Sequence, residues 1–575
     1  MAVQKALARN KVLGKIEERT MRKFMNIFAA ALIMLAAASC EKNEVLPDNN
    51  SEGKIVTLNA SINNGGTKTS LGGEKGSDDK YPVLWSEGDA IAVIQEDIDS
   101  ENYGSVYIFT LSEGGAGKAS ATFECNNANG FNPDLDYRAV YPASSVVLTT
   151  DGTFEKYSFS ATQSYVQNSF GVGAMPMKTN MYRGTNNPLL FSNAFGVLKL
   201  QLKGADNENV TSIVVTSDNA LSGEAIIKWG SIVLNGTAAE NKKVTLDCSA
   251  DGGVALNQET ATYFHIALPA GAESGLSLMI HTDKASYYKQ VPVDDKNKVV
   301  AGSILAMPVL DLTKPLNPYI ENGVNLGDGI PLVTTDGSVI VWAPVNCGYD
   351  NKHKVGLLYQ WGRKYGQGYK SKIEGDIVEF IDERPTLATG AAEANRNKFY
   401  KGDAGGYGDW LAQNERSPEL WNGGNEESPV KTEYDPCPEG WRVPTNNELV
   451  TLWVGEPNTS YPTNKTAPSD QVGEKDGIKG FWAKSEVGVN KVFFPVYYVL
   501  NWNSTNTDGY AGGGNSSAYW SSTAGNSNNA FSEALDIVFS GANLILVASE
   551  KQRAFGYSVR CVKDMPQSQP MPGSN

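Results

Sequence analysis

The sequence predicts a mainly β protein, with two β-sandwiches in series followed by an α+β domain. Glycine supplies 58 of the 575 residues and long apolar periods are few, which favours short strands joined by turns. Apolar and polar residues alternate in several segments before residue 316. Nine of the eleven tryptophans follow residue 317, so the composition changes at the proline-containing stretch 314–318.

The first element is predicted to direct export. A short basic region, Met21 to Lys23, precedes the apolar run 24–38, which is too short to span a bilayer but fits a signal peptide. Small residues then lead to Cys40 in a pattern that resembles a bacterial lipoprotein signal, which is cut before a cysteine that receives the lipid. An ordinary secretory signal is the alternative. We expect a signal peptide over 1–39, with Met21 as the true start, and a lipidated tether over 40–53.

Two β-patterned blocks follow, over 54–185 and 186–316. In the second block, Leu198, Leu200 and Leu202 share one face of a segment whose intervening residues are polar, which is typical of a half-buried strand. The segments that we expect to be strands are 55–60, 90–93, 197–202, 212–216 and 277–280. Their spacing fits two sandwiches in series.

These two blocks resemble the fimbrillin-like family of Bacteroides-type pilus subunits. The resemblance rests on the segments 85–89, 140–143, 187–193 and 213–223. It implies two tandem transthyretin-like β-sandwiches and assembly with other fimbrial subunits by strand exchange. In such exchange a protease removes an N-terminal strand and a neighbour's strand fills the slot.

The processing site departs from this family. Its protease is often directed to arginine, yet no arginine lies between Cys40 and Arg138. Lys54 and Lys68 flank the first predicted strand, and ordinary solvated turn lysines are the favoured interpretation of both. Cleavage is therefore absent or uses another protease.

The third block, 317–565, is predicted to hold a helix and several strands, before a disordered tail over 566–575. Thr445 and Glu448 have the spacing of a capping box, so a helix is expected to begin there. Leu449, Leu452 and Trp453 would form its buried stripe. Further strands are expected over 519–523 and 557–562.

From residue 323 to 564 the chain resembles the major paralogous domain of Fibrobacter. The matching segments are 342–347, 359–362, 437–445, 520–522 and 559–562. The resemblance implies a C-type-lectin-like fold, related to the formylglycine-generating fold, and a disulfide between Cys437 and Cys561. Two buried thiols are the alternative. Cys347 would then be the unpaired cysteine of this domain.

Aromatic residues in a polar, Asn- and Gly-rich stretch are the candidate ligand-binding residues. Trp502 and Tyr510 lie in this stretch and could stack on sugar faces or anchor a protein, although packing beneath the loop is the alternative. The triplet 456–458 matches a sugar-binding motif of true C-type lectins, but a plain turn fits it better. Trp441, Trp482 and Trp520 sit in apolar patterns and are expected in the core.

Composition and motifs exclude several functions. The formal charge is −15 and no basic tract follows the signal, so nucleic acid is a poor partner and membrane attachment must be covalent or mediated by a partner. The three histidines show no metal-ligand spacing, and we expect His353 in a surface loop. No nucleophile elbow, zinc-protease motif or phosphate loop is present, so we expect no catalytic residue, metal or cofactor.

Together these features predict a fimbrial subunit, the tip adhesin, anchored by lipid in the outer membrane. A large C-terminal domain leaves no obvious free C-terminal donor strand, and this domain would bind a glycan or protein on host or neighbouring cells. The first alternative is a surface glycan-binding lipoprotein that never polymerises. The second is an enzyme of the formylglycine-generating type with Cys347 as its reactive thiol.

Overall fold

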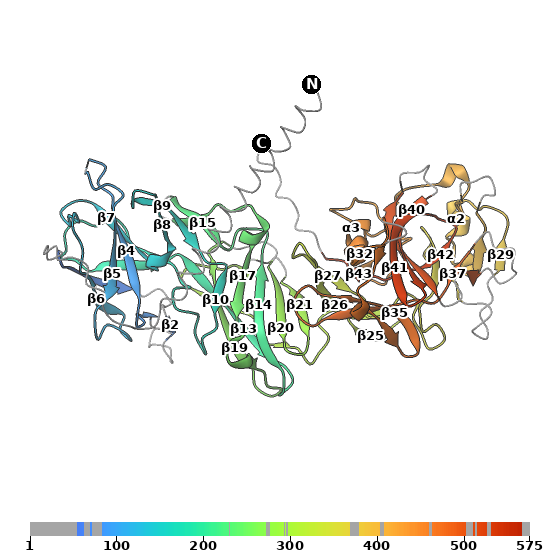
Figure 1. Ribbon diagram of the computed structural model, residues 1–575, viewed down its shortest axis with the longest axis horizontal. Helices are drawn as coiled ribbons and strands as arrows, with labels where there is room; N and C mark the ends of the chain where they lie inside the picture. Colours follow the sequence, from blue (N-terminus) through green and yellow to red (C-terminus); the bar gives the residue numbers. More distant parts are fainter. Residues whose placement is uncertain are drawn as a thin grey trace, which may run out of the picture. The chain divides into compact units, whose positions relative to one another are not determined.

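The computed structural model describes residues 54–565, with short gaps. The gaps are 63–69, 72–82, 100, 229–230, 272–275, 292–293, 295–296, 369–378, 403–407, 459–462, 502–509, 512–514 and 526–530. Ile55–Asn575 forms one compact unit. The protein is mainly β, as predicted (Figure 1). No helix among the described residues is long and apolar enough to cross a membrane.

The first strands close into a barrel. In spatial order its strands are β1 (Val56–Ile62), β12 (Leu189–Asn193), β11 (Met177–Lys178), β7 (Tyr137–Tyr141), β4 (Ala90–Gln95), β5 (Val106–Leu111) and β6 (Ser120–Cys125). β1 and β4 confirm the strands expected over 55–60 and 90–93. An aromatic cluster fills the interior, where the Trp85 ring meets Phe123 edge-on at a centroid distance of 4.8 Å.

Two further sheets pack face to face after the barrel. One contains β10 (Thr162–Ser164), β17 (Lys243–Asp247), β14 (Asn209–Thr216), β20 (Ser277–Thr282) and β21 (Ser286–Gln290), with β18 (Val254–Ala255) beside β14. The other contains β19 (Thr262–Pro269), β13 (Phe195–Lys203), β22 (Ile304–Ala306) and β23 (Leu310–Asp311). Leu198, Leu200 and Leu202 of β13 lie in the shared core opposite Ile213 of β14, so the predicted one-sided burial is confirmed.

The strands of the first two blocks interleave around the predicted boundary at 185/186. β12 follows that boundary and completes the barrel, whereas β10 precedes it and pairs with β17. A four-stranded sheet is shared in the same way. Its order is β16 (Ser231–Leu234), β15 (Gly223–Lys228), β9 (Phe154–Phe159) and β8 (Val146–Leu148). The composition of the chain does not indicate that strands of one block pair with strands of the other.

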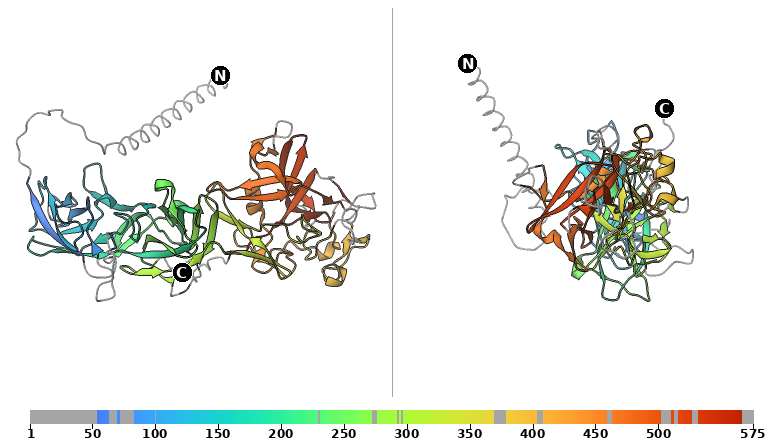
Figure 2. Two further views of the ribbon diagram at one scale, coloured as in Figure 1. Left: turned by 90° about the horizontal axis from the view of Figure 1, so that it is seen from below. Right: turned by 90° about the vertical axis from the view of Figure 1, so that its right-hand side faces the viewer.

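The C-terminal block is built around a long sheet that is antiparallel except where β39 and β42 pair in parallel. Its order is β32 (Glu456–Pro457), β33 (Lys465–Thr466), β41 (Asn543–Gln552), β40 (Phe531–Ser540), β39 (Ser516–Ala524), β42 (Gly556–Ser558), β37 (Val499–Leu500) and β38 (Tyr510–Ala511), with β28 (Leu358–Gln360) beside β42. β40 and β41 are its longest strands (Figures 1 and 2).

Smaller elements complete this block. A second sheet has the order β26 (Ile330–Val333), β27 (Val339–Trp342), β43 (Val562–Lys563) and β31 (Trp441–Arg442). A third contains β34 (Val472–Lys475), β35 (Ile478–Lys484) and β36 (Lys491–Pro495). Two strand pairs also belong to this block, β24 (Pro318–Glu321) with β25 (Val324–Asp328) and β29 (Glu379–Ile381) with β30 (Lys398–Tyr400), whereas β2 (Ser70–Leu71) pairs with β3 (Val83–Leu84) in the first block. The α-helices are α2 (Leu387–Gly390) and α3 (Asn446–Leu449).

The predicted helix start is confirmed, but the helix is short. The Thr445 hydroxyl accepts a hydrogen bond from the backbone N–H of Glu448. The Glu448 carboxylate accepts one from the backbone N–H of Thr445, which completes the capping box. A 3₁₀ turn, Val450–Leu452, follows α3 and ends the helix after one turn. The strand expected over 557–562 is divided into β42 and β43, because residues 559–561 leave one sheet to enter the other.

Candidate functional site

The first strand of the chain, β1, is held between two neighbours in the barrel. It pairs antiparallel with β6 from Val56 to Ser61 and parallel with β12 from Ala60 to Ile62. Its sequence alternates, so Leu58, Ala60 and Ile62 point into the barrel core. Leu58 retains only 2% of its exposure. Loss of β1 would open the barrel, leaving two strand edges unpaired and an apolar slot between them.

The last strand, β43, is held in a different way. It lies between β27 and β31, and a disulfide joins Cys437 to Cys561 immediately before it. The S–S distance is 2.08 Å, and this is the pair that the resemblance implies. The strand at this end of the chain is therefore tied covalently to the segment that precedes β31.

Arg560 adds a polar clamp beside the disulfide. Its guanidinium is buried and donates to Asn346 Oδ1 at 2.7 Å, Phe493 O at 2.8 Å and Ala343 O at 3.0 Å. Burial lowers its pKa to about 10, so it stays charged at neutral pH. These bonds connect the residues just before the last strand to two other segments of the domain, 343–346 and the strand that contains Phe493.

Cys347 lies against this disulfide. Its sulfur and those of Cys437 and Cys561 all lie within 4.8 Å of one another, and all three are buried. Within the described ranges, this is the single group of three or more His, Cys, Asp or Glu ligand atoms close enough to hold a metal ion. Because two of the sulfurs are joined, the oxidised protein offers only one thiol there.

The predicted ligand-binding residues cannot be placed against a ligand. Trp502 lies outside the described residues, and Tyr510 lies in β38, where only its backbone is described. Trp441 and Trp520 are buried as expected, whereas Trp482 is half-buried and stacks on Phe493 at 4.9 Å. The triplet 456–458 lies at the end of the long sheet, where Glu456 and Pro457 form β32.

The expectation for His353 is wrong. This side chain is only 8% exposed, and its Nδ1 lies 2.9 Å from both carboxylate oxygens of Asp350, three residues earlier. The carboxylate three residues earlier was the sequence signal for this pairing.

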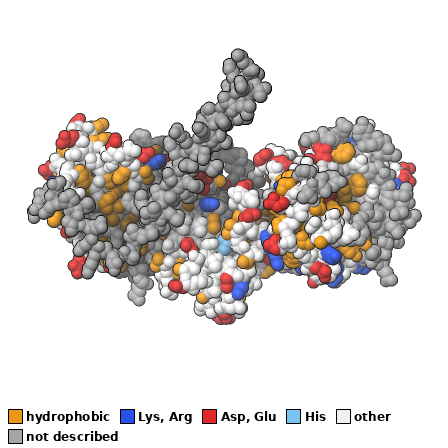
Figure 3. All heavy atoms as spheres, viewed as in Figure 1, with side chains coloured by type: hydrophobic (Ala, Val, Ile, Leu, Met, Phe, Trp, Pro, Cys, Tyr) orange, Lys and Arg blue, Asp and Glu red, His pale blue; other side chains and the backbone are white. Residues whose placement is uncertain are grey.

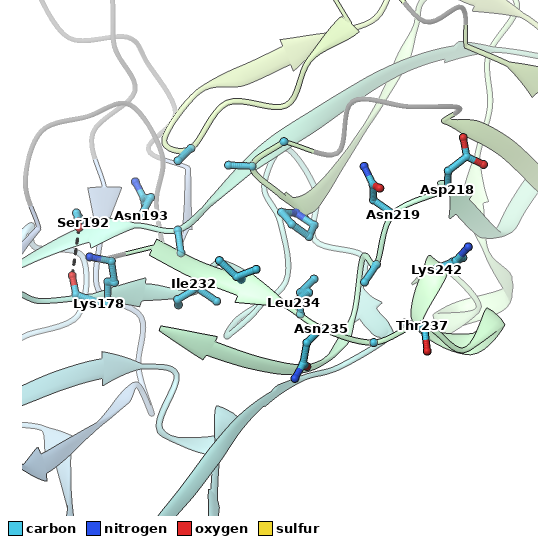
Figure 4. A pocket seen from close by; sticks show the side chains of 18 residues that line it. Lys178, Ser192, Asn193, Asp218, Asn219, Ile232, Leu234, Asn235, Thr237 and Lys242 are labelled. Carbon is cyan, nitrogen blue, oxygen red and sulfur yellow. Dashed lines mark hydrogen bonds between the residues drawn. The ribbon is translucent and has the colours of Figure 1, made fainter. Parts of the chain in front are cut away.

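A pocket of about 830 Å³ was not anticipated from the sequence. It lies beside β16, the edge strand of its sheet (Figure 4). Lys178 and Ser192 lie at one end and Asp218 and Lys242 at the other, with Ile232 and Leu234 of β16 among the lining side chains. The 18 lining residues come from seven chain segments, so no local motif could have shown it.

Acidic and basic side chains are mixed over the molecular face in Figure 3. Among the coloured side chains of that view, neither sign gathers into one large patch.

Comparison with known proteins identifies the C-terminal block. Residues 341–563 match the family described as the Fibrobacter succinogenes major domain, so this part of the chain is such a domain. No curated protein matches the sequence.

Solved structures resemble the chain only distantly. A protein from Bacteroides ovatus assigned to cell adhesion is 14% identical, with 44% of this chain and 92% of that one covered and a TM-score of 0.28. A fimbrial protein from the same species is 12% identical, with coverages of 88% and 99% and a TM-score of 0.22. The tip fimbrial protein of Porphyromonas gingivalis, with a C-terminal truncation, is 11% identical, with coverages of 42% and 82% and a TM-score of 0.19. Similarity at these TM-scores carries no argument about this chain.

Proposed function

We propose that this protein is a surface lipoprotein and fimbrial tip subunit, whose C-terminal Fibrobacter succinogenes major domain presents a binding surface. The observation that carries the proposal is the contrast between the two terminal strands. β1 is held by backbone pairing, packing and two side-chain hydrogen bonds to β6, with no covalent bond, whereas β43 is preceded by a disulfide and a buried arginine clamp. Such a subunit would accept a strand at its barrel, whereas β43 is not free to be donated while the disulfide before it is intact.

The position of β1 decides which cleavage would open the slot. Lys54 precedes β1, so cleavage after Lys54 would remove only the tether and leave the barrel closed. Lys68 is the first basic residue after β1 in the sequence, so cleavage there would cut β1 from the rest of the chain. A strand from another subunit could then pair with β6 and β12 and bury its own apolar face.

The same proposal includes the type of each domain, the lipid anchor and the ligand-binding residues. The blocks 54–185 and 186–316 would be transthyretin-like sandwiches with exchanged strands, and the C-terminal domain would have a C-type-lectin-like fold. Cys40 would carry the lipid that anchors the protein in the outer membrane. Trp502 and Tyr510 would contact a glycan or protein ligand. The domain would bind without catalysing a reaction.

One observation favours a second function. Because no arginine lies between Cys40 and Arg138, arginine-directed processing cannot free β1. The alternative is therefore a lipoprotein that keeps β1, never polymerises, and binds glycans as a single subunit.

Two measurements on intact cells separate these functions. Immunogold electron microscopy with antibody against residues 317–565 should label filament ends, with a deletion strain as control. N-terminal sequencing of the mature protein should find Thr69 first if β1 is released after Lys68. Label scattered on the envelope with Cys40 still present would support the solitary lipoprotein. Label seen only after permeabilisation would overturn both.

A Cys40→Ser variant should lose its membrane attachment in either case.

A further inference from the structure

A hydrogen-bonded chain connects the free thiol of the C-terminal domain to its disulfide. Cys347 Sγ donates to Glu321 Oε1 at 3.5 Å, and the other oxygen of this carboxylate accepts from Tyr319 Oη at 3.2 Å. Tyr319 Oη also lies 3.5 Å from Cys561 Sγ. The chain therefore begins at the one free thiol of the cluster and ends at a disulfide sulfur.

Other contacts hold the thiol in place. Tyr359 Oη donates to Cys347 Sγ at 3.2 Å, and the same sulfur lies 3.3 Å from Pro436 O, next to Cys437. Gly348 N donates to Glu321 Oε1 at 2.8 Å and fixes the carboxylate. The sulfur of Cys347 thus lies within 4.8 Å of both disulfide sulfurs, and it must turn into line with the Cys437–Cys561 bond before it can attack.

We propose that this cluster is a thiol–disulfide exchange site, in which Cys347 displaces Cys561 from Cys437. The Cys347 thiol gives its proton to Glu321, and its sulfur attacks Cys437 Sγ. A Cys347–Cys437 bond forms as the Cys437–Cys561 bond breaks, and the electron pair of the broken bond goes to Cys561 Sγ. Tyr319 protonates this sulfur and regains a proton from the Glu321 carboxyl. No oxidant or reductant is consumed, because one disulfide and one thiol are present before and after.

The environment explains why a base is needed. Burial raises the pKa of the Cys347 thiol well above its usual range, and the charge of Glu321 raises it further. The thiol is therefore protonated at neutral pH, and only a positioned acceptor can generate the attacking thiolate. Burial also raises the pKa of the Glu321 carboxyl, which makes it a better proton acceptor than an exposed carboxylate.

The exchange changes what anchors the last strand. In the structure, Cys561 ties the chain just before β43 to Cys437. After exchange, Cys437 is tied to Cys347, and β43 is held by its strand pairing, the burial of Val562 and the Arg560 bonds, without a covalent anchor. The site thus removes a covalent anchor without a redox partner. This inference stands whether or not the protein is a fimbrial subunit.

Peptide mapping of the full chain tests the exchange. Native protein is held at pH 7 or pH 9, quenched in acid, digested with pepsin and analysed without reduction. We expect peptides that join Cys347 to Cys437, with Cys561 free, to accumulate faster at pH 9. Cys125 and Cys248, buried in the other domains, should remain thiols and so report any unfolding. Native protein that shows only Cys437–Cys561 peptides at both pH values would overturn the proposal.

Two variants make the test sharper. In Glu321→Gln, exchange should slow by about 100-fold at pH 7 and recover toward the wild-type rate as pH rises, because hydroxide replaces the missing base. Equal slowing at every pH would mean that Glu321 only shapes the site. In folded Cys561→Ser, oxidised glutathione should produce a Cys347–Cys437 bond. Two persistent thiols there would show that the sulfurs cannot meet, and would refute the mechanism.

Discussion

The retention of β1 in the barrel can be tested with one core substitution. Leu58 is 2% exposed and belongs to the barrel core, so Leu58→Ala should cost about 3 kcal/mol in the free energy that holds β1, within the range for buried leucines. A difference of about 3 kcal/mol corresponds to roughly a 100-fold change in an equilibrium constant. After cleavage of the chain beyond β1, the variant should therefore release the strand about 100-fold more readily.

Cys125 provides the readout. It lies on β6 directly opposite Val56 of β1 and is buried, so its thiol should react with a maleimide only when β1 departs. Cys248 lies in the core of the next sandwich and should stay protected. A protease site inserted between Gly65 and Gly66 permits cleavage on demand, and mass spectrometry follows the labelling of Cys125.

A conservative change on the exposed face of the same strand is the matched control. Thr57 is exposed and pairs with Glu124, so Thr57→Ser should change labelling by no more than about two-fold. If cleaved Leu58→Ala labels Cys125 no faster than cleaved Thr57→Ser, core packing does not hold β1. If uncleaved protein labels equally fast, release needs no cleavage and the slot argument fails.

Three further changes probe the C-terminal domain in urea unfolding experiments. Replacing both Cys437 and Cys561 by serine should lower the free energy of unfolding by about 4–5 kcal/mol, because their sequence separation is 124 residues; an unchanged midpoint would contradict this. Thr445→Ala should cost about 1 kcal/mol through loss of the capping box, and a cost near zero would show that tertiary packing alone holds α3. Burial raises the pKa of Asp409 to about 6, so its ionisation opposes folding and its contribution to stability should fall as pH rises from 4 to 6. Asp409→Asn should flatten this decline relative to wild type, and parallel curves would refute the assignment.

Local patterns predicted the elements that depend on local physics. The alternation in β13 follows from the two-residue period of a strand, and the capping box at Thr445 follows from spacing along one turn. The length of α3 was not predictable in this way, because the 3₁₀ turn after Leu449 is set by packing under the long sheet. The exchange of β10 and β12 between blocks depends on pairings far apart in the sequence, which no short window contains.

The candidate sites also include features that the sequence indicated and features that depend on contacts between distant residues. Family resemblance implied the Cys437–Cys561 pair and left Cys347 as a spare thiol. It did not show that Cys347 lies against that pair, since 89 residues separate it from Pro436, whose carbonyl it contacts. Glu321 and Tyr319 were also missed, because a buried carboxylate in the short strand β24 has no motif of its own. The pocket beside β16 was missed because its lining comes from separate turns and strand ends.

The two terminal strands are held in different ways, β1 by non-covalent contacts and β43 by a covalent bond just before it, and this difference decides which of them a competing strand could displace. β1 is released when its pairing with β6 and β12 and the burial of three side chains are lost together, so its hold depends on the concentration of any competing strand. β43 is first restrained by a covalent bond, which no competing strand can displace. Under the proposed function, an incoming strand would therefore exchange with β1 but not with β43 while Cys437 and Cys561 remain joined. If exchange at Cys347 removes that bond, β43 comes under the same competitive control as β1, and the redox-neutral step becomes the one that decides whether the C-terminal end stays closed.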